Sequence, residues 1–219
     1  MEAQLRTAIA NEISRLGVSA PALMSRARVE KLYEIFVLTC LARALRQLGA
    51  IVSARDSSDR ATSDLVFRLG PGLIWAPTSA PGFIHVAYKG REYEIQNGLR
   101  VLGQSKVLHE LDVALIDRDE AVRCRRNQIN PSQARIKFLA ECKYYGDSLP
   151  LALGREYLGL SKEFSLRIKT IVSNISSDQI HNLVTRHKGT ENFDVSMIRP
   201  NNIEQLVQWL ANELRQVLG

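Results

Sequence analysis

The sequence is poor in the residues that build cross-links. Its three cysteines, Cys40, Cys124 and Cys142, are odd in number, lie far apart and form no CxxC pair, and its four histidines are scattered. Disulfide frameworks and structural zinc sites need paired, closely spaced ligands, so neither is expected to organise this chain. A reduced, cytoplasmic location is the simplest expectation from this cysteine usage.

Long apolar runs are also missing. No stretch approaches the roughly 20 apolar residues of a membrane-spanning helix, and the N-terminus has no basic segment followed by an apolar one. We therefore expect no membrane association and no signal peptide. What is present suits one folded domain: 219 residues, 45% hydrophobic and 24% charged. The net charge of +6 is compatible with a polyanionic partner.

Hydrophobic periodicity predicts four helices, over residues 4–16, 23–48, 150–164 and 201–218, the last capped by Asn201 or Asn202. The second of these carries Glu34 on its apolar face, where an unpaired carboxylate is costly. Two explanations are open. Glu34 either pairs with Lys31 or Arg43 at the edge of the core, or is delivered by the helix to a functional site.

Alternating and β-branched segments predict strands. We expect two strands around a polar loop within 50–70, a hairpin over 83–97 with a tight turn at Lys89-Gly90, a link over 98–106, and strands at 107–117, 137–145, 166–174 and 193–198. Residues 118–137 form a basic connection that contains a loop. Its arginines, Arg123, Arg125 and Arg126, are either solvated or available to phosphates.

Two of the expected strands carry charged residues in apolar surroundings. Asp112 follows Glu110 at the start of one strand, and Glu141 and Lys143 share a face of the other. Each group is either a solvated strand end or part of a site. Neighbouring strands lie about 4.8 Å apart, so Asp112 and Glu141 can share one cation if their strands are adjacent. Mg²⁺ favours a few carboxylate oxygens together with water and phosphate.

Such an arrangement suits phosphodiester hydrolysis. The metal would lower the pKa of a bound water and neutralise the charge that builds on the phosphate. Lys143 would orient the water or help to deprotonate it, and would add positive charge at the scissile phosphate.

The segments His109-Glu110-Leu111-Asp112-Val113 and Glu141-Cys142-Lys143, with Tyr33-Glu34 on the preceding helix, resemble the PD-(D/E)xK nuclease superfamily, in particular its Mrr-like and Holliday-junction-resolvase-like members. The resemblance implies a restriction-endonuclease-like α/β fold, with an αβββαβ core over 23–174 and a central mixed sheet flanked by helices. Residues 1–219 would form a single domain, with helices 4–16 and 201–218 as additions. Leu111 departs from the proline common at that position, and the 29 positions between Asp112 and Glu141 are assigned to a basic insertion at 118–137.

The resemblance also implies roles for individual residues. Asp112, Glu141 and the backbone carbonyl of Cys142 would bind the metal, and Lys143 would be catalytic. Glu34 matches an acid that the first core helix often supplies, and Arg155 falls where the following helix often places a polar residue. The expected protein is a Mg²⁺- or Mn²⁺-dependent endonuclease acting on DNA, as a monomer or homodimer, in restriction or genome defence. The alternative is a non-catalytic nucleic-acid-binding or assembly subunit that keeps the fold.

Overall fold

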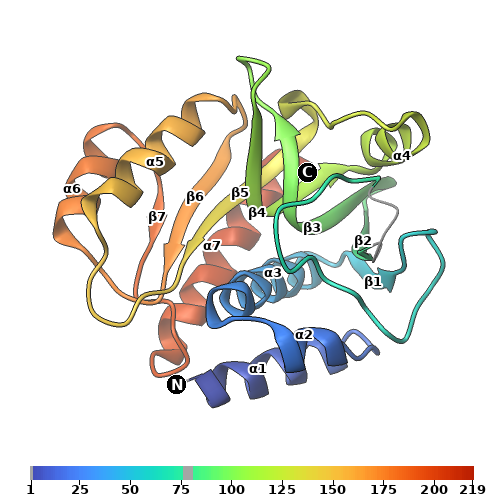
Figure 1. Cartoon of the computed structure of the whole chain (residues 1–219), viewed down its shortest axis with the longest axis horizontal. Coiled ribbons are helices and arrows are strands. Elements are labelled where there is room, and N and C mark those ends of the chain that lie inside the picture. Colours follow the sequence, from blue (N-terminus) through green and yellow to red (C-terminus); the bar gives the residue numbers. More distant parts are fainter. Residues whose placement is uncertain (1, 76–80) are drawn as a thin grey trace.

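The computed structural model describes residues 2–75 and 81–219, which form a mixed sheet with helices on both faces (Figure 1). The sheet has seven strands, ordered as they occur in the chain. Their bounds are β1 Ile51–Arg55, β2 Phe83–Tyr88, β3 Arg91–Leu102, β4 Leu108–Asp117, β5 Ile136–Lys143, β6 Ile168–Ser173 and β7 Glu191–Asn192. Strands β1 to β5 are antiparallel neighbours, whereas β5, β6 and β7 are parallel. The expected mixed sheet flanked by helices is therefore confirmed.

The helices are distributed over the two faces of the sheet. Their bounds are α1 Glu2–Ser14, α2 Pro21–Arg26, α3 Val29–Gln47, α4 Arg118–Asn127, α5 Leu151–Lys162, α6 Asp178–Arg186 and α7 Pro200–Leu218. Helices α1, α3 and α7 share the main hydrophobic core with one face of the sheet. On the other face, α4 packs on β3 to β5, and α5 and α6 pack on β6. Parallel strands need such a crossover, and α5 and α6 supply it.

Helix α3 lies between the sheet and the helices α1 and α7, so nearly its whole circumference is buried. The predicted continuous helix over 23–48 is wrong in one respect, because the chain turns at Ala27 and Arg28, which are both extended. No glycine or proline marks this corner. Ala27 is only 6% exposed, so its burial in the core favours the turn over a straight helix.

Several strand boundaries also differ from the expectation. The segment 65–67 joins no strand, although Leu65 and Phe67 are buried by packing against the core. The expected link at 98–106 is wrong, since β3 continues to Leu102 and makes a long hairpin with β4. Only residues 191–192 extend the sheet near its far edge, rather than 193–198.

Two helical expectations are corrected as well. The first half of the basic connection 118–137 is helix α4, so the loop occupies only its second half. Helix α7 begins at Pro200 with Arg199 at the N-cap position, instead of being capped by Asn201 or Asn202. Proline suits the first helical position because its missing N–H has no intrahelical partner there.

Candidate active site

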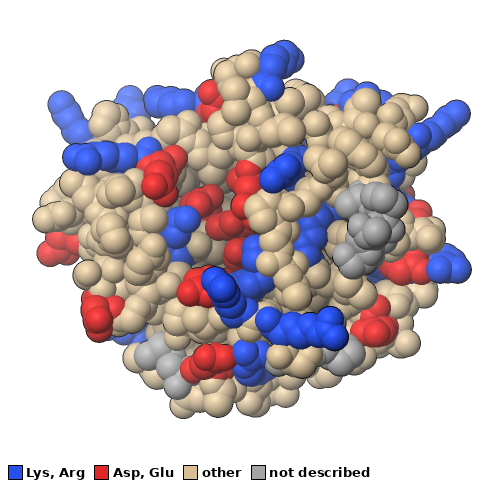
Figure 2. Space-filling view, viewed as in Figure 1, with Lys and Arg blue, Asp and Glu red and all other residues tan. Residues whose placement is uncertain are grey.

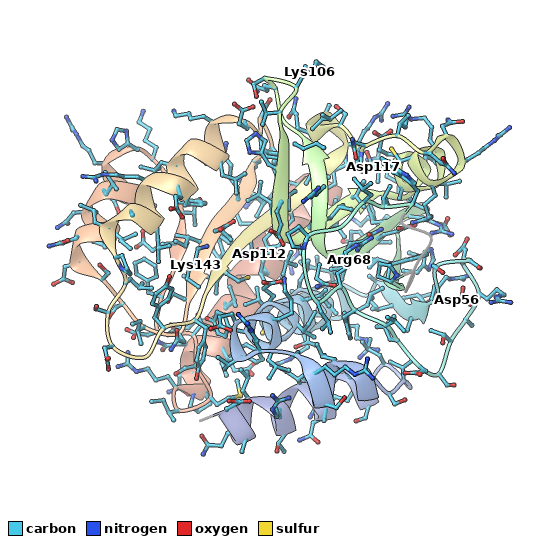
Figure 3. All side chains as sticks on the ribbon, viewed as in Figure 1. Asp56, Arg68, Lys106, Asp112, Asp117 and Lys143 are labelled. Carbon is cyan, nitrogen blue, oxygen red and sulfur yellow. The ribbon has the colours of Figure 1, made fainter. Side chains whose placement is uncertain are left out.

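The pairing of β4 with β5 brings the charged residues of these strands together. The ladder runs to Val113, which pairs with Ala140, so the next antiparallel position places Asp112 opposite Glu141 on one face of the sheet. The backbone N–H of Cys142 donates a hydrogen bond to Asp112 Oδ2 at 2.7 Å. Figure 3 shows Asp112 and Lys143 near the centre of the molecule, on these neighbouring strands. The adjacency that the sequence required is therefore present.

Asp112 lies where the β3–β4 hairpin changes its packing. Side chains two residues apart on a regular strand point to the same face. Val113 belongs to the main core, whereas Leu111 belongs to the hydrophobic cluster on the other face of the sheet. Gly98 stands opposite Asp112 in the ladder register and has a φ of +55°. A Cβ at that position would lie 3.1 Å from the carbonyl oxygen of Gly70. Both the backbone conformation and the space therefore favour glycine beside Asp112.

Strand β5 presents Glu141 and Lys143 on the same face, as predicted. Lys143 Nζ donates to Glu141 Oε1 at 2.6 Å, and both side chains are mostly buried, at 18% and 16% exposed. Burial, followed by the charge of Asp112, raises the pKa of Glu141 to about 7. Burial opposes the charged form of Lys143, but the charge and hydrogen bond of Glu141 outweigh it and raise the lysine pKa above its usual range.

Glu34 reaches the same cluster from α3. It is buried, and Lys31 Nζ donates to its Oε2 at 2.5 Å. Burial, and next the charge of Asp112, raise the pKa of Glu34 to about 8. The pairing with Lys31 that the sequence left open is therefore present, and Glu34 also lies close enough to Asp112 to interact with its charge. Arg43 instead pairs with Glu204.

The buried and partly buried side chains of the cluster have more negative than positive charge, and the exposed Arg100 acts on Glu110 from outside it. Its members are the acids Glu34, Glu110, Asp112 and Glu141 and the lysines Lys31 and Lys143. With all six ionised, four negative and two positive charges leave a net charge of −2. Burial is the largest cause of the raised pKa of every acid in the cluster. Protons or a divalent cation would relieve this excess of partly buried negative charge.

In their present arrangement, the acids of the cluster do not form a metal site. Within residues 2–75 and 81–219, no three His, Cys, Asp or Glu side chains are arranged to hold one. One oxygen each of Glu34, Asp112 and Glu141 accepts a bond from a lysine or a backbone amide. The second oxygen of each accepts none from any described residue. Carboxylate oxygens are ligands that Mg²⁺ prefers, so the donor set has the chemistry of a Mg²⁺ site, although its present arrangement among the described residues is not one.

The arginines expected to contact substrate lie outside this cluster. Helix α4 begins after Asp117, five positions beyond Asp112 along β4, or about 17 Å at the rise of a strand. Arg123 donates to both oxygens of Glu120, each at 2.9 Å.

The other three arginines differ from one another. Arg125 binds the fully buried Glu94. Arg126 and Arg155 are exposed on α4 and α5 and form no ion pair with any described residue.

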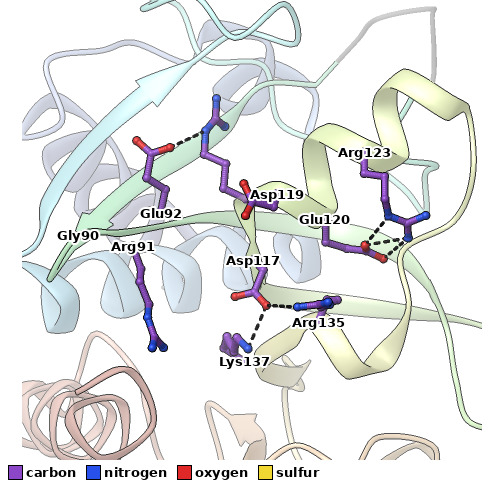
Figure 4. Close-up of a pocket in the computed structure, with 10 residues that line it drawn as sticks. Gly90, Arg91, Glu92, Asp117, Asp119, Glu120, Arg123, Arg135 and Lys137 are labelled. Carbon is purple, nitrogen blue, oxygen red and sulfur yellow. Dashed lines mark hydrogen bonds and ion pairs between the residues drawn. The ribbon is translucent and has the colours of Figure 1, made fainter.

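A cavity of about 660 Å³ lies between the β2–β3 turn, the start of α4 and the start of β5 (Figure 4). Basic and acidic side chains both line it, and they bind one another. Lys137 Nζ lies 3.0 Å from Asp117 Oδ2, and Arg123 Nη2 lies 2.8 Å from Glu120 Oε2. Because these charges are mutually paired, the cavity is a weaker candidate for an ion or phosphate site than the acidic cluster.

Two members of the cluster are not predicted site residues. The sequence offers Lys31 as a partner of Glu34, and a spacing of three residues places both side chains on one side of a helix. The sequence places Glu110 at the start of a strand. Its position 3.8 Å from Lys31 Nζ depends on how α3 approaches β4, which no local pattern encodes.

No protein-family model matches the chain, and no curated protein matches it either. No helix among the described residues is both long and apolar enough to cross a bilayer.

Proposed function

We propose that this protein is a Mg²⁺-dependent endodeoxyribonuclease whose site is the acidic cluster. One observation carries the proposal: Asp112 lies on the strand next to the one that bears Glu141 and Lys143. The backbone N–H of Cys142 donates a hydrogen bond to the Asp112 carboxylate. Carboxylates and a lysine on adjacent strands are the arrangement that PD-(D/E)xK nucleases use. Glu34, which enters from α3, completes the set of acids.

The fold is consistent with this assignment. Helix α3, the antiparallel strands β3, β4 and β5, helix α5 and strand β6 follow in the order αβββαβ. We infer that they form a restriction-endonuclease-like core. Strands β1 and β2 and helix α4 are then additions to it, and α4 occupies the basic insertion between the two strands of the site.

Each residue has a role that its surroundings support. Asp112, Glu141 and the carbonyl of Cys142 would hold Mg²⁺, which supplies Lewis acidity and an activated water when bound. Lys143, held by Glu141, would donate to a phosphate oxygen and offset its charge. Glu34, buried beside Asp112, would add a further carboxylate to the site from α3.

The test is nicking of supercoiled plasmid and of branched DNA in the presence and absence of Mg²⁺. We expect Lys143→Ala to lower the cleavage rate by about 100-fold or more, since it removes a group from the reacting phosphate. Lys162→Ala, an exposed lysine on α5, should cut like the wild type. Absence of cleavage by the wild type, or equal cleavage by Lys143→Ala, would contradict the proposal.

A second candidate is a non-catalytic nucleic-acid-binding subunit. It is favoured by the present pairing of Glu34 with Lys31 and of Glu141 with Lys143, which occupies the carboxylates without a metal. Calorimetric titration with Mn²⁺ and Mg²⁺ distinguishes the two. If no site is found that Asp112→Ala abolishes, while DNA still binds with salt dependence, the subunit is the better assignment.

A further inference from the structure

A groove leads from the acidic cluster to the corner between α2 and α3. It has a volume of about 380 Å³ and is lined by Arg26, Ala27, Arg28, Glu30, Lys31, Glu34 and Leu69. Because Lys31 and Glu34 line its inner end, the groove is continuous with the cluster. Figure 2 shows acidic side chains near the centre of this face of the molecule, with basic side chains around them.

The outer end of the groove is basic. Arg26 and Arg28 are exposed, and neither forms a hydrogen bond or ion pair with another described residue. Many other arginines in the chain are paired, as Arg43 is with Glu204. Both guanidinium groups are therefore available to an anion.

The corner that carries these arginines is fixed by its backbone. Ala27 between them is 6% exposed, and its N–H donates to the Leu23 carbonyl at 3.1 Å. Its own carbonyl accepts a hydrogen bond from Arg6 Nη2 at 3.1 Å. The backbone between Arg26 and Arg28 is thus tied to both α1 and α2. Placing charged groups on a fixed corner limits the conformational entropy lost when they bind a ligand.

The size and chemistry of the groove favour a phosphodiester strand. Guanidinium groups bind phosphate through paired hydrogen bonds, and the 46% exposed Leu69 offers an apolar wall for a sugar or base. A B-form duplex, whose major groove alone is about 12 Å wide, is too large to enter a cavity of about 380 Å³. The sugar-phosphate backbone of a single strand is small enough to lie in it.

We propose that this groove binds the backbone of one nucleic-acid strand, with Arg26 and Arg28 contacting phosphates next to the one at the acidic cluster. The inference rests on the proposed function in taking the cluster as the place of cleavage. Phosphate contacts carry no sequence information, so the groove would hold the strand in position without selecting its bases.

The proposal is tested by fluorescence anisotropy with labelled single-stranded and duplex oligonucleotides of several sequences, in Ca²⁺ or EDTA to prevent cleavage. We expect the double variant Arg26→Ala/Arg28→Ala to bind at least about tenfold more weakly for every sequence. The slope of log affinity against log salt should fall in magnitude by about 1–2. Arg28→Glu alone should weaken binding more than Arg28→Ala.

Arg186→Ala provides the matched control, since Arg186 is exposed and unpaired among the described residues and lies on α6 at the edge of the view in Figure 1. It should leave binding unchanged. All variants should keep the wild-type unfolding midpoint, because the altered side chains are exposed.

The outcomes separate the groove from the proposed function. Groove variants with the affinity and salt slope of the control would overturn the groove, even if the protein cuts DNA. Weaker binding by the groove variants, together with absence of cleavage by the wild type, would support the proposed strand-binding groove and contradict the proposed nuclease activity. Saturable binding of a polyglutamate peptide by a wild type that binds no nucleic acid would overturn the groove in favour of an acidic protein partner.

Discussion

Burial separates two glutamates that lie one helical turn apart on α3. Glu30 is exposed, whereas Glu34 is buried and has a pKa of about 8. The apolar stripe of α3 is enough to predict that Glu34 faces the interior. The size of its pKa shift cannot be predicted locally, because it depends on Asp112, which a distant strand brings to the same place.

This difference predicts a pH-dependent stability. The pKa of Glu34 is higher in the folded state than its unfolded value of about 4.5, so the folded state binds more protons between these values, and stability falls as the pH rises from about 4.5 to 8. Glu34→Gln removes that loss. We expect the variant to be more stable than the wild type at pH 8–9 by about 1–3 kcal/mol, and the difference to narrow towards pH 5. Urea unfolding in EDTA measures this.

The control for Glu34→Gln is Glu30→Gln, which should change stability by less than about 0.5 kcal/mol at any pH in this range. A Glu34→Gln variant that is less stable than the wild type at pH 9 would show that the pair with Lys31 outweighs both the cost of burying the Glu34 charge and its repulsion from Asp112.

Within helix α4, three arginines that look equivalent in the sequence have different roles. Arg125 contacts the fully buried Glu94 and lies over the ring of Phe83 at 4.8 Å. Arg123 binds Glu120 on its own helix, and Arg126 is exposed. The basic composition of 118–137 predicts that these residues are available to phosphates. It cannot show that a buried acid on β3 occupies one of them, because that contact forms only when α4 folds onto the sheet.

Removing Arg125 and removing Arg123 should therefore have unequal effects. Arg125→Ala leaves Glu94 with fewer partners in a fully buried position, and we expect a loss of about 2–3 kcal/mol in the free energy of unfolding. Arg123→Ala should cost clearly less, because its 49% exposed side chain is screened by solvent. Urea denaturation of both variants checks this, and equal losses would contradict a structural role specific to Arg125.

Across the whole molecule, the sequence predicts periodic elements better than their ends. The hairpin turn at Lys89-Gly90 and a strand bearing Glu141 and Lys143 follow from local patterns, and both are present, although β5 ends at Lys143 rather than at the predicted residue 145. The corner at Ala27 and the extension of β3 to Leu102 do not. The first depends on burial in a core assembled from distant helices, and the second on pairing with β4. The groove beside the site exists only because of that corner, so it could not be predicted from the sequence.

Charge is also distributed unevenly over the molecule, which has a net charge of +6 but an acidic cluster of −2 when fully ionised. A divalent cation that binds this cluster only in the folded state must stabilise the whole protein. With free Mn²⁺ at about a hundred times its Kd, the gain is about 2.7 kcal/mol, which raises the Tm by about 5–11 °C for a chain of this size. Thermal unfolding with Mn²⁺ and with EDTA measures the shift, and Asp112→Asn should abolish it. An equal shift in that variant would place the ion elsewhere, since Asp112 is the carboxylate whose charge raises the pKa of both Glu34 and Glu141.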